Sequence, residues 1–110
     1  DKETNEMIGS IKFEKMDEIK KEAELGYFLR KDYWGQGLMT EVVRELVFLS
    51  FTKFGFKRLT IITHEENLAS QKVALKAGFK LFRQFKGSDR YTRKMRDYTE
   101  YRYEKGDFNE

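Results

Sequence analysis

Two closely spaced glycines follow an apolar, strand-like run and precede a run of helical period. The strand-like run begins near Tyr27, the turn spans residues 33–38 (YWGQGL), and the helical pattern starts directly after it. Because glycine has no Cβ, Gly35 and Gly37 allow positive φ and let several backbone N–H groups approach one anion. The N-terminus of the following helix also favours negative charge. This spacing therefore predicts a cradle for a phosphate group.

The turn departs from two common nucleotide-binding motifs. No Gly-Lys-Ser/Thr sequence follows Gly37, as the phosphate loop of nucleotide hydrolases requires. The turn also lacks the third glycine of the dinucleotide fingerprint and the acidic residue about 20 positions further on. These differences disfavour nucleoside triphosphate hydrolysis and hydride transfer. A pyrophosphate cradle without a metal ion is the remaining interpretation.

The elements around this turn indicate a mixed α/β arrangement. Residues 7–13 and 24–29 read as two strands joined by a charged turn at 16–21, which predicts an antiparallel hairpin. Residues 59–63 are rich in β-branched side chains and predict a buried strand parallel to the strand before the helix. Between them, a helix of about five turns is expected, with Gly55 as its C-terminal stop. Its expected core stripe is Leu38, Val42, Val43, Leu46, Val47, Leu49 and Phe54.

The second half of the chain completes the order β-β-α-β-α-β-β. Asn67 is a suitable N-cap for a short helix through Ala77. Residues 80–85 predict a strand, residues 87–93 a polar loop, and residues 98–103 a final antiparallel strand. The sequence therefore predicts an α/β (α+β) fold with a mixed, partly antiparallel sheet and a central βαβ unit. We expect one domain over residues 1–110.

Composition limits the class of protein. A chain of 110 residues that is 39% hydrophobic can bury one small core. The absence of cysteine excludes disulfides, thiolate zinc sites and thiol nucleophiles. No run approaches the roughly 20 apolar residues of a membrane span, so we expect a soluble, cytoplasmic protein without membrane contact. Residues 71–105 hold eleven Lys or Arg against four Asp or Glu, which suits an anionic ligand.

Five segments stand out by their order and spacing. They are residues 8–11 (IGSI), 25–27 (LGY), 33–41 (YWGQGLMTE), 67–70 (NLAS) and 76–79 (KAGF). Together they resemble the GNAT N-acetyltransferases, and within that superfamily the subgroup that acetylates N-terminal amines of ribosomal proteins. The resemblance runs from about residue 7 to residue 79, with a weaker match to residue 103. Members of the family have a strand, helices and another strand before this region, so the domain looks shortened at its N-terminus.

The resemblance implies an acetyl-coenzyme A site that needs no metal. The glycine turn would hold the pyrophosphate, and the end of the preceding strand would pair through its backbone with the pantetheine arm. Asp32 occupies a position where the family usually has Gln or Arg, so we expect its carboxylate to point away from the phosphates or to cap the turn. The residues expected to contact acetyl-coenzyme A are Phe28, Leu29, Arg30, Trp34, Gly35, Gln36, Gly37, Leu38, Met39, Asn67 and Ser70.

The same resemblance assigns catalytic roles. Ser70 would lie near the sulfur and donate to the departing thiolate, because Ala74 stands where many relatives have a tyrosine. The attacking amine must also lose a proton, for which Glu24 is the first candidate and Asp97 the second. His64 is the only histidine, and we interpret it as a solvated loop residue after the third strand.

The implied reaction moves an acetyl group from acetyl-coenzyme A to a primary amine, such as the N-terminus of a ribosomal or other protein. Three alternatives stay open. They are a coenzyme A-binding module without turnover, an acetyltransferase for small amines such as polyamines or antibiotics, and a basic RNA-associating domain. The last is suggested by cations and aromatic rings that alternate from Arg90 onward. An unpaired edge at residues 7–13 would favour pairing with a second copy, so we expect a homo-oligomer, most simply a dimer.

Overall fold

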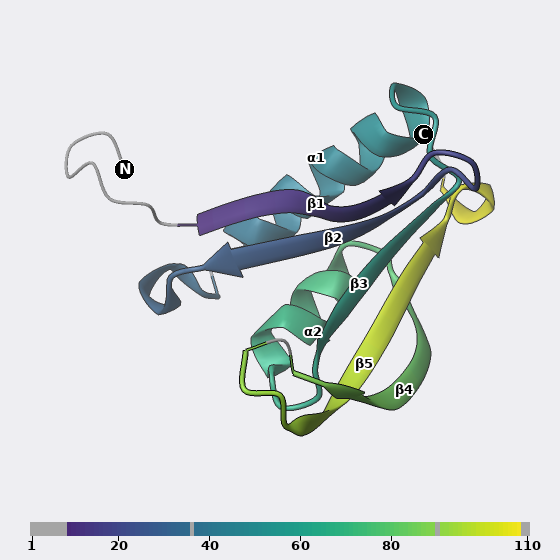
Figure 1. The fold of residues 1–110 in the computed structure, drawn as a ribbon. Helices are drawn as coiled ribbons and strands as arrows, with labels where there is room; N and C mark the ends of the chain where they lie inside the picture. Colours follow the sequence, from purple (N-terminus) through teal and green to yellow (C-terminus); the bar gives the residue numbers. More distant parts are fainter. Residues whose placement is uncertain (1–8, 36, 90, 109–110) are drawn as a thin grey trace.

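Five strands form one mixed sheet (Figure 1). The structure is a computed structural model and describes residues 9–35, 37–89 and 91–108. The spatial order of the strands is β1-β2-β3-β5-β4, and β2-β3 is the parallel pair. Their bounds are β1 Gly9–Asp17, β2 Glu22–Leu29, β3 Arg58–His64, β4 Lys80–Ser88 and β5 Met95–Glu104.

Two α-helices and two short 3-10 helices connect these strands. Helix α1 links β2 to β3, and α2 links β3 to β4, so the predicted order β-β-α-β-α-β-β is confirmed. The predicted cap of α2 is also present, because the Asn67 side chain accepts a hydrogen bond from the Ser70 N–H at 3.0 Å. The bounds are η1 Lys31–Tyr33, α1 Leu38–Thr52, α2 Leu68–Lys76 and η2 Lys105–Asp107.

The central strands β2 and β3 separate partway along their length (Figure 1). They pair from Glu22 opposite Arg58 to Leu25 opposite Ile61. Strand β2 then continues for four residues to Leu29, and β3 for three residues to His64. In this second half β2 keeps its antiparallel partner β1 on its other edge. The sheet is therefore open between the ends of β2 and β3.

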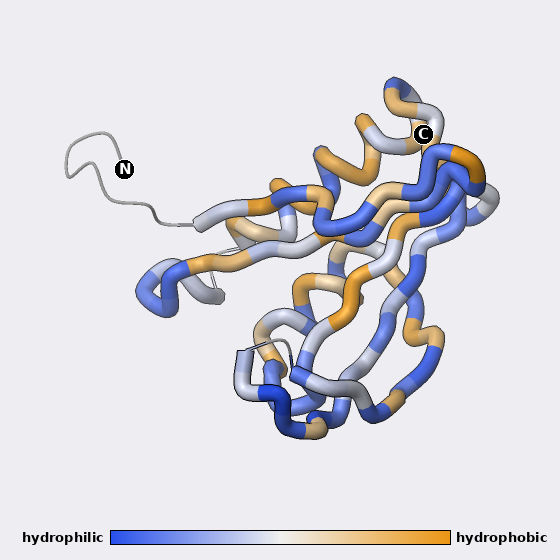
Figure 2. The backbone as a smooth tube through the Cα atoms, in the orientation of Figure 1, coloured by the Kyte–Doolittle hydropathy of each residue, from blue (hydrophilic) through white to orange (hydrophobic). Residues whose placement is uncertain are grey.

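Both α-helices lie on the same face of the sheet, where they enclose the core (Figure 1). Apolar residues recur along α1 and in the middle of β3 (Figure 2). Side chains point alternately to the two faces of a strand. In β2 and β3, the residues that face the helices are Ala23, Leu25, Leu59 and Ile61. The buried apolar residues are Ala23, Leu25, Met39, Val43, Val47, Phe51, Phe56, Leu59, Ile61, Ala74, Ala77, Phe79 and Tyr101.

The predicted core stripe of α1 is correct at Val43 and Val47 but wrong at Leu38 and Val42. Val42 is 43% exposed and Leu38 is 36% exposed, whereas Met39 is buried. The packed side of α1 follows the i, i+4 series that begins at Met39 and includes Val43, Val47 and Phe51. Apolar residues cover more than half of this helix's circumference, so their spacing alone does not decide which side meets the sheet.

Several element ends differ from the prediction. Strand β1 continues to Asp17 instead of residue 13, and β2 begins at Glu22 instead of residue 24, so the turn of the hairpin is shorter than the predicted 16–21. Helix α1 ends at Thr52, before the predicted Phe54. Strand β4 continues to Ser88, and β5 begins already at Met95, so the predicted polar loop at 87–93 is shorter. The reason is the antiparallel ladder itself, which pairs Ser88 with Met95 although most of the local side chains are polar and exposed.

None of the helices within the described ranges is long and apolar enough to cross a lipid bilayer.

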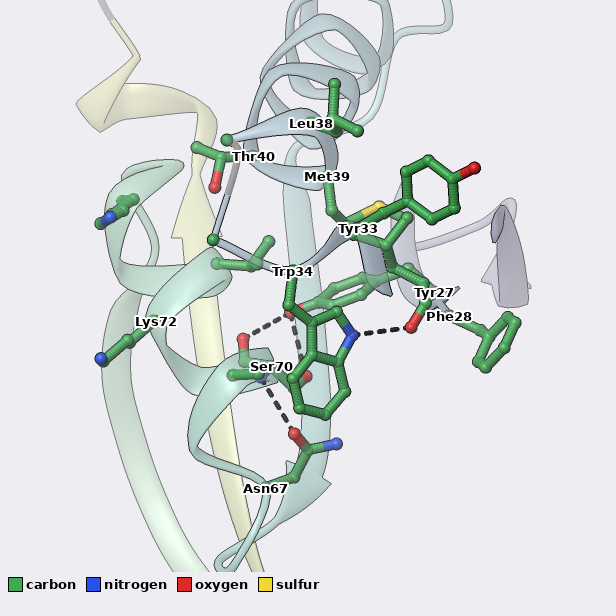
Figure 3. A pocket seen from close by; sticks show the side chains of 16 residues that line it. Tyr27, Phe28, Tyr33, Trp34, Leu38, Met39, Thr40, Asn67, Ser70 and Lys72 are labelled. Carbon is green, nitrogen blue, oxygen red and sulfur yellow. Dashed lines mark hydrogen bonds between the residues drawn. The ribbon is translucent and has the colours of Figure 1, made fainter. Parts of the chain in front are cut away.

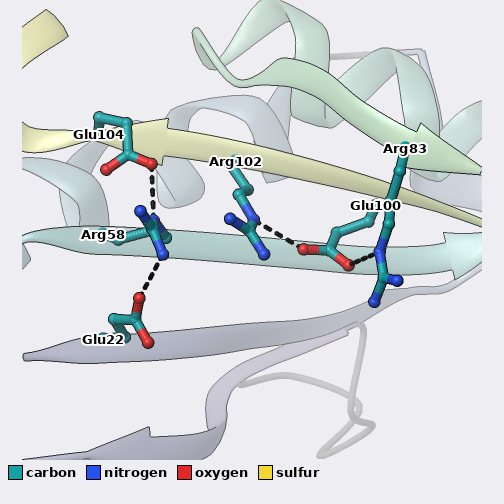
Figure 4. A network of polar contacts seen from close by, with 6 residues as sticks. All are labelled: Glu22, Arg58, Arg83, Glu100, Arg102 and Glu104. Carbon is teal, nitrogen blue, oxygen red and sulfur yellow. Dashed lines mark hydrogen bonds and ion pairs between the residues drawn. The ribbon is translucent and has the colours of Figure 1, made fainter. Parts of the chain in front are cut away.

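The helix-free face of the sheet carries two clusters of ion pairs (Figure 4). Arg58 on β3 contacts Glu22 on β2 and donates to Glu104 on β5 at 2.6 Å. In the second cluster, the buried Glu100 carboxylate accepts from Arg83 at 2.9 Å and from Arg102 at 2.7 Å. These contacts join four strands, β2, β3, β5 and β4, on the side without helices.

The carboxylate of Glu100 should stabilise the fold in a pH-dependent way. Burial alone would raise its pKa, but the hydrogen bonds and charges of Arg83 and Arg102 outweigh burial and hold the pKa of Glu100 below its usual range. A carboxylate with a lowered folded-state pKa adds stability above its unfolded pKa of about 4.3, and that stability is lost as the pH falls through the folded value.

We expect Glu100→Gln to lower the free energy of unfolding by about 2 kcal/mol at pH 7, because it leaves two guanidinium groups facing a neutral amide. The difference from the unsubstituted chain should shrink below pH 4. Glu66→Gln is the control, since its side chain is 76% exposed and pairs with Arg96. Urea unfolding at several pH values measures both, and equal losses in the two variants would contradict this role for Glu100.

Candidate active site

A pocket of about 490 Å³ lies where β2 and β3 separate (Figure 3). Its walls come from the end of β2, the glycine turn, the first turn of α1 and the exposed side of α2. This volume lies in the range of sites for small molecules and cofactors. The residues from the sequence prediction that line it are Phe28, Leu29, Trp34, Gly35, Gly37, Leu38, Met39, Asn67 and Ser70.

Two of the predicted contact residues are not in this set. Arg30 does not line the pocket; its guanidinium donates to the Asp32 carboxylate at 3.0 Å and lies near the Tyr33 ring. Asp32 is likewise absent from the lining, as expected for an acidic side chain beside a phosphate cradle. Gln36 lies outside the described residues.

The glycine turn has the backbone conformation that the sequence predicts. Gly35 has φ 78° and Gly37 has φ 75°, and Gly37 is the N-cap of α1. A Cβ added to either glycine would have no neighbour within 4 Å, so the turn borders open space. The first intrahelical hydrogen bond runs from the Glu41 N–H to the Gly37 carbonyl at 3.0 Å. The N–H groups of residues 38–40 therefore have no acceptor within the helix and can serve an anion.

Two lysines on α2 that the sequence pattern did not single out also belong to the pocket wall. Lys72 and Lys76 are one helical turn apart on α2, and both line the pocket. None of the lining residues among those described is acidic. The arrangement suits a ligand with several negative charges. The sequence signal was available in the i, i+4 spacing of these lysines after the Asn67 cap, combined with the basic C-terminal third.

Ser70 is held by two residues at the opening of the sheet (Figure 3). Its backbone N–H donates to the Asn67 side chain, the N-cap of α2. The Tyr27 hydroxyl donates to the Ser70 carbonyl at 2.6 Å and lies 3.1 Å from the Ser70 hydroxyl. Burial raises the pKa of Tyr27 to about 12, against a smaller lowering by the hydrogen bond with Ser70. Tyr27 therefore stays a neutral hydroxyl at any physiological pH.

Trp34 lies over the end of β2. Its indole N–H donates to the Leu29 carbonyl at 2.7 Å, and its ring is 47% exposed. The Leu29 carbonyl therefore faces the pocket. Residues two apart in a strand present their backbone groups to the same edge, so the peptide groups of Tyr27 also face the opening. Within the described residues β2 does not pair with β3 beyond Leu25, so the Tyr27 peptide groups on this edge are open to an extended ligand, whereas the Leu29 carbonyl already accepts from Trp34.

The predicted proton acceptors lie away from this pocket. Glu24 sits between Ala23 and Leu25, which are buried beneath the helices, so its side chain is on the helix-free face of the sheet. It lies opposite Thr60, one residue before the last β2–β3 pair. Asp97 is in β5 and is exposed. Neither residue lines the pocket.

The interpretation of His64 as a loop residue is wrong, although its side chain is 40% exposed to solvent. His64 is the last residue of β3 and pairs with Tyr98 of β5, on which its ring stacks at 4.8 Å between centroids. Its Nε2 lies 3.4 Å from the Asp89 carboxylate. The β3–β5 ladder extends to the His64–Tyr98 pair, one residue beyond the predicted strand at 59–63, so His64 belongs to the strand.

Comparison with known proteins places these features in a family. Residues 1–80 match the model of the acetyltransferase (GNAT) domain. The chain is 32% identical over 78 residues to the uncharacterized N-acetyltransferase YoaA of Bacillus subtilis (strain 168), covering 71% of this chain and 44% of that protein. It is also 32% identical over 75 residues to the ribosomal-protein-serine acetyltransferase of Escherichia coli (strain K12), covering 68% and 42%.

A solved structure shows the same arrangement. The ribosomal L7/L12 alpha-N-protein acetyltransferase RimL, in complex with coenzyme A, superposes with a TM-score of 0.81 at 28% identity. The superposition covers 91% of this chain and 56% of RimL. The chain thus spans less than half the length of the two curated relatives. On the match of residues 1–80, the chain belongs to the GNAT acetyltransferase family.

Proposed function

We propose that this domain binds acetyl-coenzyme A and transfers its acetyl group to a primary amine, with a protein N-terminal amine as the acceptor class. The pocket at the β2–β3 opening carries the proposal, because it combines a backbone anion cradle, two lysines and a hydroxyl pair within one cavity. The relative that acetylates ribosomal-protein serine supports the acceptor class.

The residues present fit this ligand. The free N–H groups at the start of α1 and the open space beside Gly35 and Gly37 suit a pyrophosphate. The backbone edge of Tyr27 and Leu29 suits the amide groups of a pantetheine arm. Acetyl-coenzyme A supplies the thioester whose carbonyl carbon the amine attacks.

Two residues would handle the protons of the reaction. Glu24, on the helix-free face, would accept the proton that the amine loses as its nitrogen bonds to the acetyl carbon, directly or through a water. Ser70 would donate a hydrogen bond to the thiolate that leaves when the carbon–sulfur bond breaks. Ser70 is on the helix-covered face of the sheet and Glu24 on the helix-free face, so the amine would enter from the helix-free face.

Calorimetry and a thiol-release assay test the function in two steps. Calorimetry with acetyl-coenzyme A should show saturable binding. Thiol release should then be faster with a peptide that begins with serine or alanine than with spermidine or an aminoglycoside. Binding without release for any amine would point to a coenzyme A-binding module. Absence of binding, with retention on RNA, would favour the RNA-associating alternative.

We expect Lys72→Met to weaken acetyl-coenzyme A binding about fivefold at low salt, and less at high salt, because the cation is exposed to solvent and is screened by salt. Acetyl-pantetheine, which has no phosphate, should bind both proteins equally. Lys53→Met at the exposed far end of α1 is the matched control. If Lys72→Met weakened acetyl-pantetheine binding as much, the lysine would not act on the phosphates.

We also propose that the domain forms a homodimer. Among the described strands, β1 lies at one edge of the sheet and pairs with β2 alone, so its other side would accept a strand of a second copy. Light scattering at tens of micromolar should give twice the chain mass. A monodisperse monomer at that concentration would argue against the dimer.

A further inference from the structure

Tyr27 and Ser70 form a hydroxyl pair whose protons can be assigned. The Tyr27 hydroxyl has one proton, and the Ser70 carbonyl oxygen, 2.6 Å away, can only accept it. The Ser70 hydroxyl, 3.1 Å from the Tyr27 oxygen, must therefore be the donor in that second contact. In this arrangement the Ser70 proton points at Tyr27.

This pair bridges the open part of the sheet. Tyr27 is on β2 two residues beyond Leu25, where pairing with β3 ends, and Ser70 is in the first turn of α2. Both residues line the pocket, and Figure 3 shows the hydroxyls meeting inside it. Any group that approaches Ser70 from the pocket also approaches Tyr27.

We propose that Tyr27 is a positioning residue for Ser70. Tyr27 holds the Ser70 hydroxyl at the sheet opening, from where this hydroxyl can rotate toward the departing sulfur. The inference rests on the proposed acetyl transfer. This rotation of the Ser70 hydroxyl breaks its neutral hydrogen bond to Tyr27 and forms a hydrogen bond to the thiolate, and hydrogen bonds to an anion are the stronger kind. The Tyr27 hydroxyl continues to donate its hydrogen bond to the Ser70 carbonyl throughout and keeps the first turn of α2 in place.

The acidity of Tyr27 argues against a different role, direct protonation of the sulfur. Its pKa of about 12 lies well above the value of about 8.5 for an ordinary thiol. Full transfer of the Tyr27 proton to a thiolate is therefore unfavourable. Tyr27 therefore acts by positioning Ser70, and the hydroxyl of Ser70 stabilises the thiolate by a hydrogen bond.

Tyr27→Phe tests this proposal because it removes only the hydroxyl. We expect kcat to fall about tenfold, the effect of one hydrogen bond to a charged group, with KM for acetyl-coenzyme A unchanged. In a Ser70→Ala background the same substitution should cause no further fall. Tyr101→Phe is the matched control, since its buried hydroxyl also reaches α2, where it donates to Gln71 at 3.1 Å. It should leave kcat unchanged.

A binding measurement separates positioning from a merely structural role. Coenzyme A and its desulfo analogue, which lacks the sulfur, are compared by calorimetry between pH 7 and 10. As the thiol of coenzyme A ionises, the unsubstituted protein should bind coenzyme A increasingly more tightly than the desulfo analogue. In Tyr27→Phe and in Ser70→Ala, this ratio of affinities should be about tenfold smaller.

The outcomes are distinguishable. If neither ligand binds the unsubstituted protein, the proposed function fails. If both ligands bind but Tyr27→Phe keeps the full preference for coenzyme A, or weakens both ligands equally, the positioning role is overturned and Tyr27 only ties β2 to α2. A further fall of kcat in the Ser70→Ala background would overturn it as well.

Discussion

Gly37→Glu should weaken acetyl-coenzyme A binding at least 100-fold while the domain stays folded. A side chain at Gly37 projects into the open space beside the first turn of α1, where the pyrophosphate is proposed to lie. The carboxylate adds repulsion between like charges to this steric block. Calorimetry with acetyl-coenzyme A measures the loss directly.

The matched control is Gly55→Glu. Gly55 follows the other end of α1, has φ 76°, and also has no neighbour within 4 Å of an added Cβ. Both substitutions carry the same left-handed strain of about 1–2 kcal/mol, so both should lower the melting temperature alike. Only Gly37→Glu should lose the ligand. Retained affinity in Gly37→Glu would show that the phosphates bind elsewhere.

Ser70→Ala should lower kcat about 100-fold and leave KM for acetyl-coenzyme A nearly unchanged, because the hydroxyl is needed only when the thiolate forms. The Asn67 cap uses the backbone N–H of residue 70, so the substitution should preserve α2. Thiol release under saturating acetyl-coenzyme A gives kcat. A loss confined to KM would mean that Ser70 only contributes to binding.

Glu24→Gln provides the contrast within the same assay. The Glu24 side chain is on the helix-free face, so its loss should affect deprotonation of the amine and not the leaving group. The Glu24→Gln rate should recover as the pH rises toward the pKa of the amine, about 8, whereas the Ser70→Ala rate should not. Identical pH profiles for the two variants would refute this division of roles.

The local elements near the site could be predicted because short-range chemistry determines them. Positive φ at Gly35 and Gly37 follows from the need for a tight strand-to-helix turn, and the structure confirms it. The cap by Asn67 depends on a side chain and an N–H three residues apart, which is also a local property.

Only the tertiary structure decided which of these elements meet. The meeting of Tyr27 with Ser70 joins residues 43 positions apart, and it depends on where β2 stops pairing with β3. The packed side of α1 and the inclusion of His64 in β3 depend on contacts with neighbouring elements, which periodicity within one segment does not contain. The sequence by itself determined the glycine turn, the cap and the order of the elements, because these are set by neighbours along the chain. The hydroxyl pair and the presence of Lys72 and Lys76 in the same pocket as the glycine turn were decided by the fold, because they require distant segments to pack at one opening.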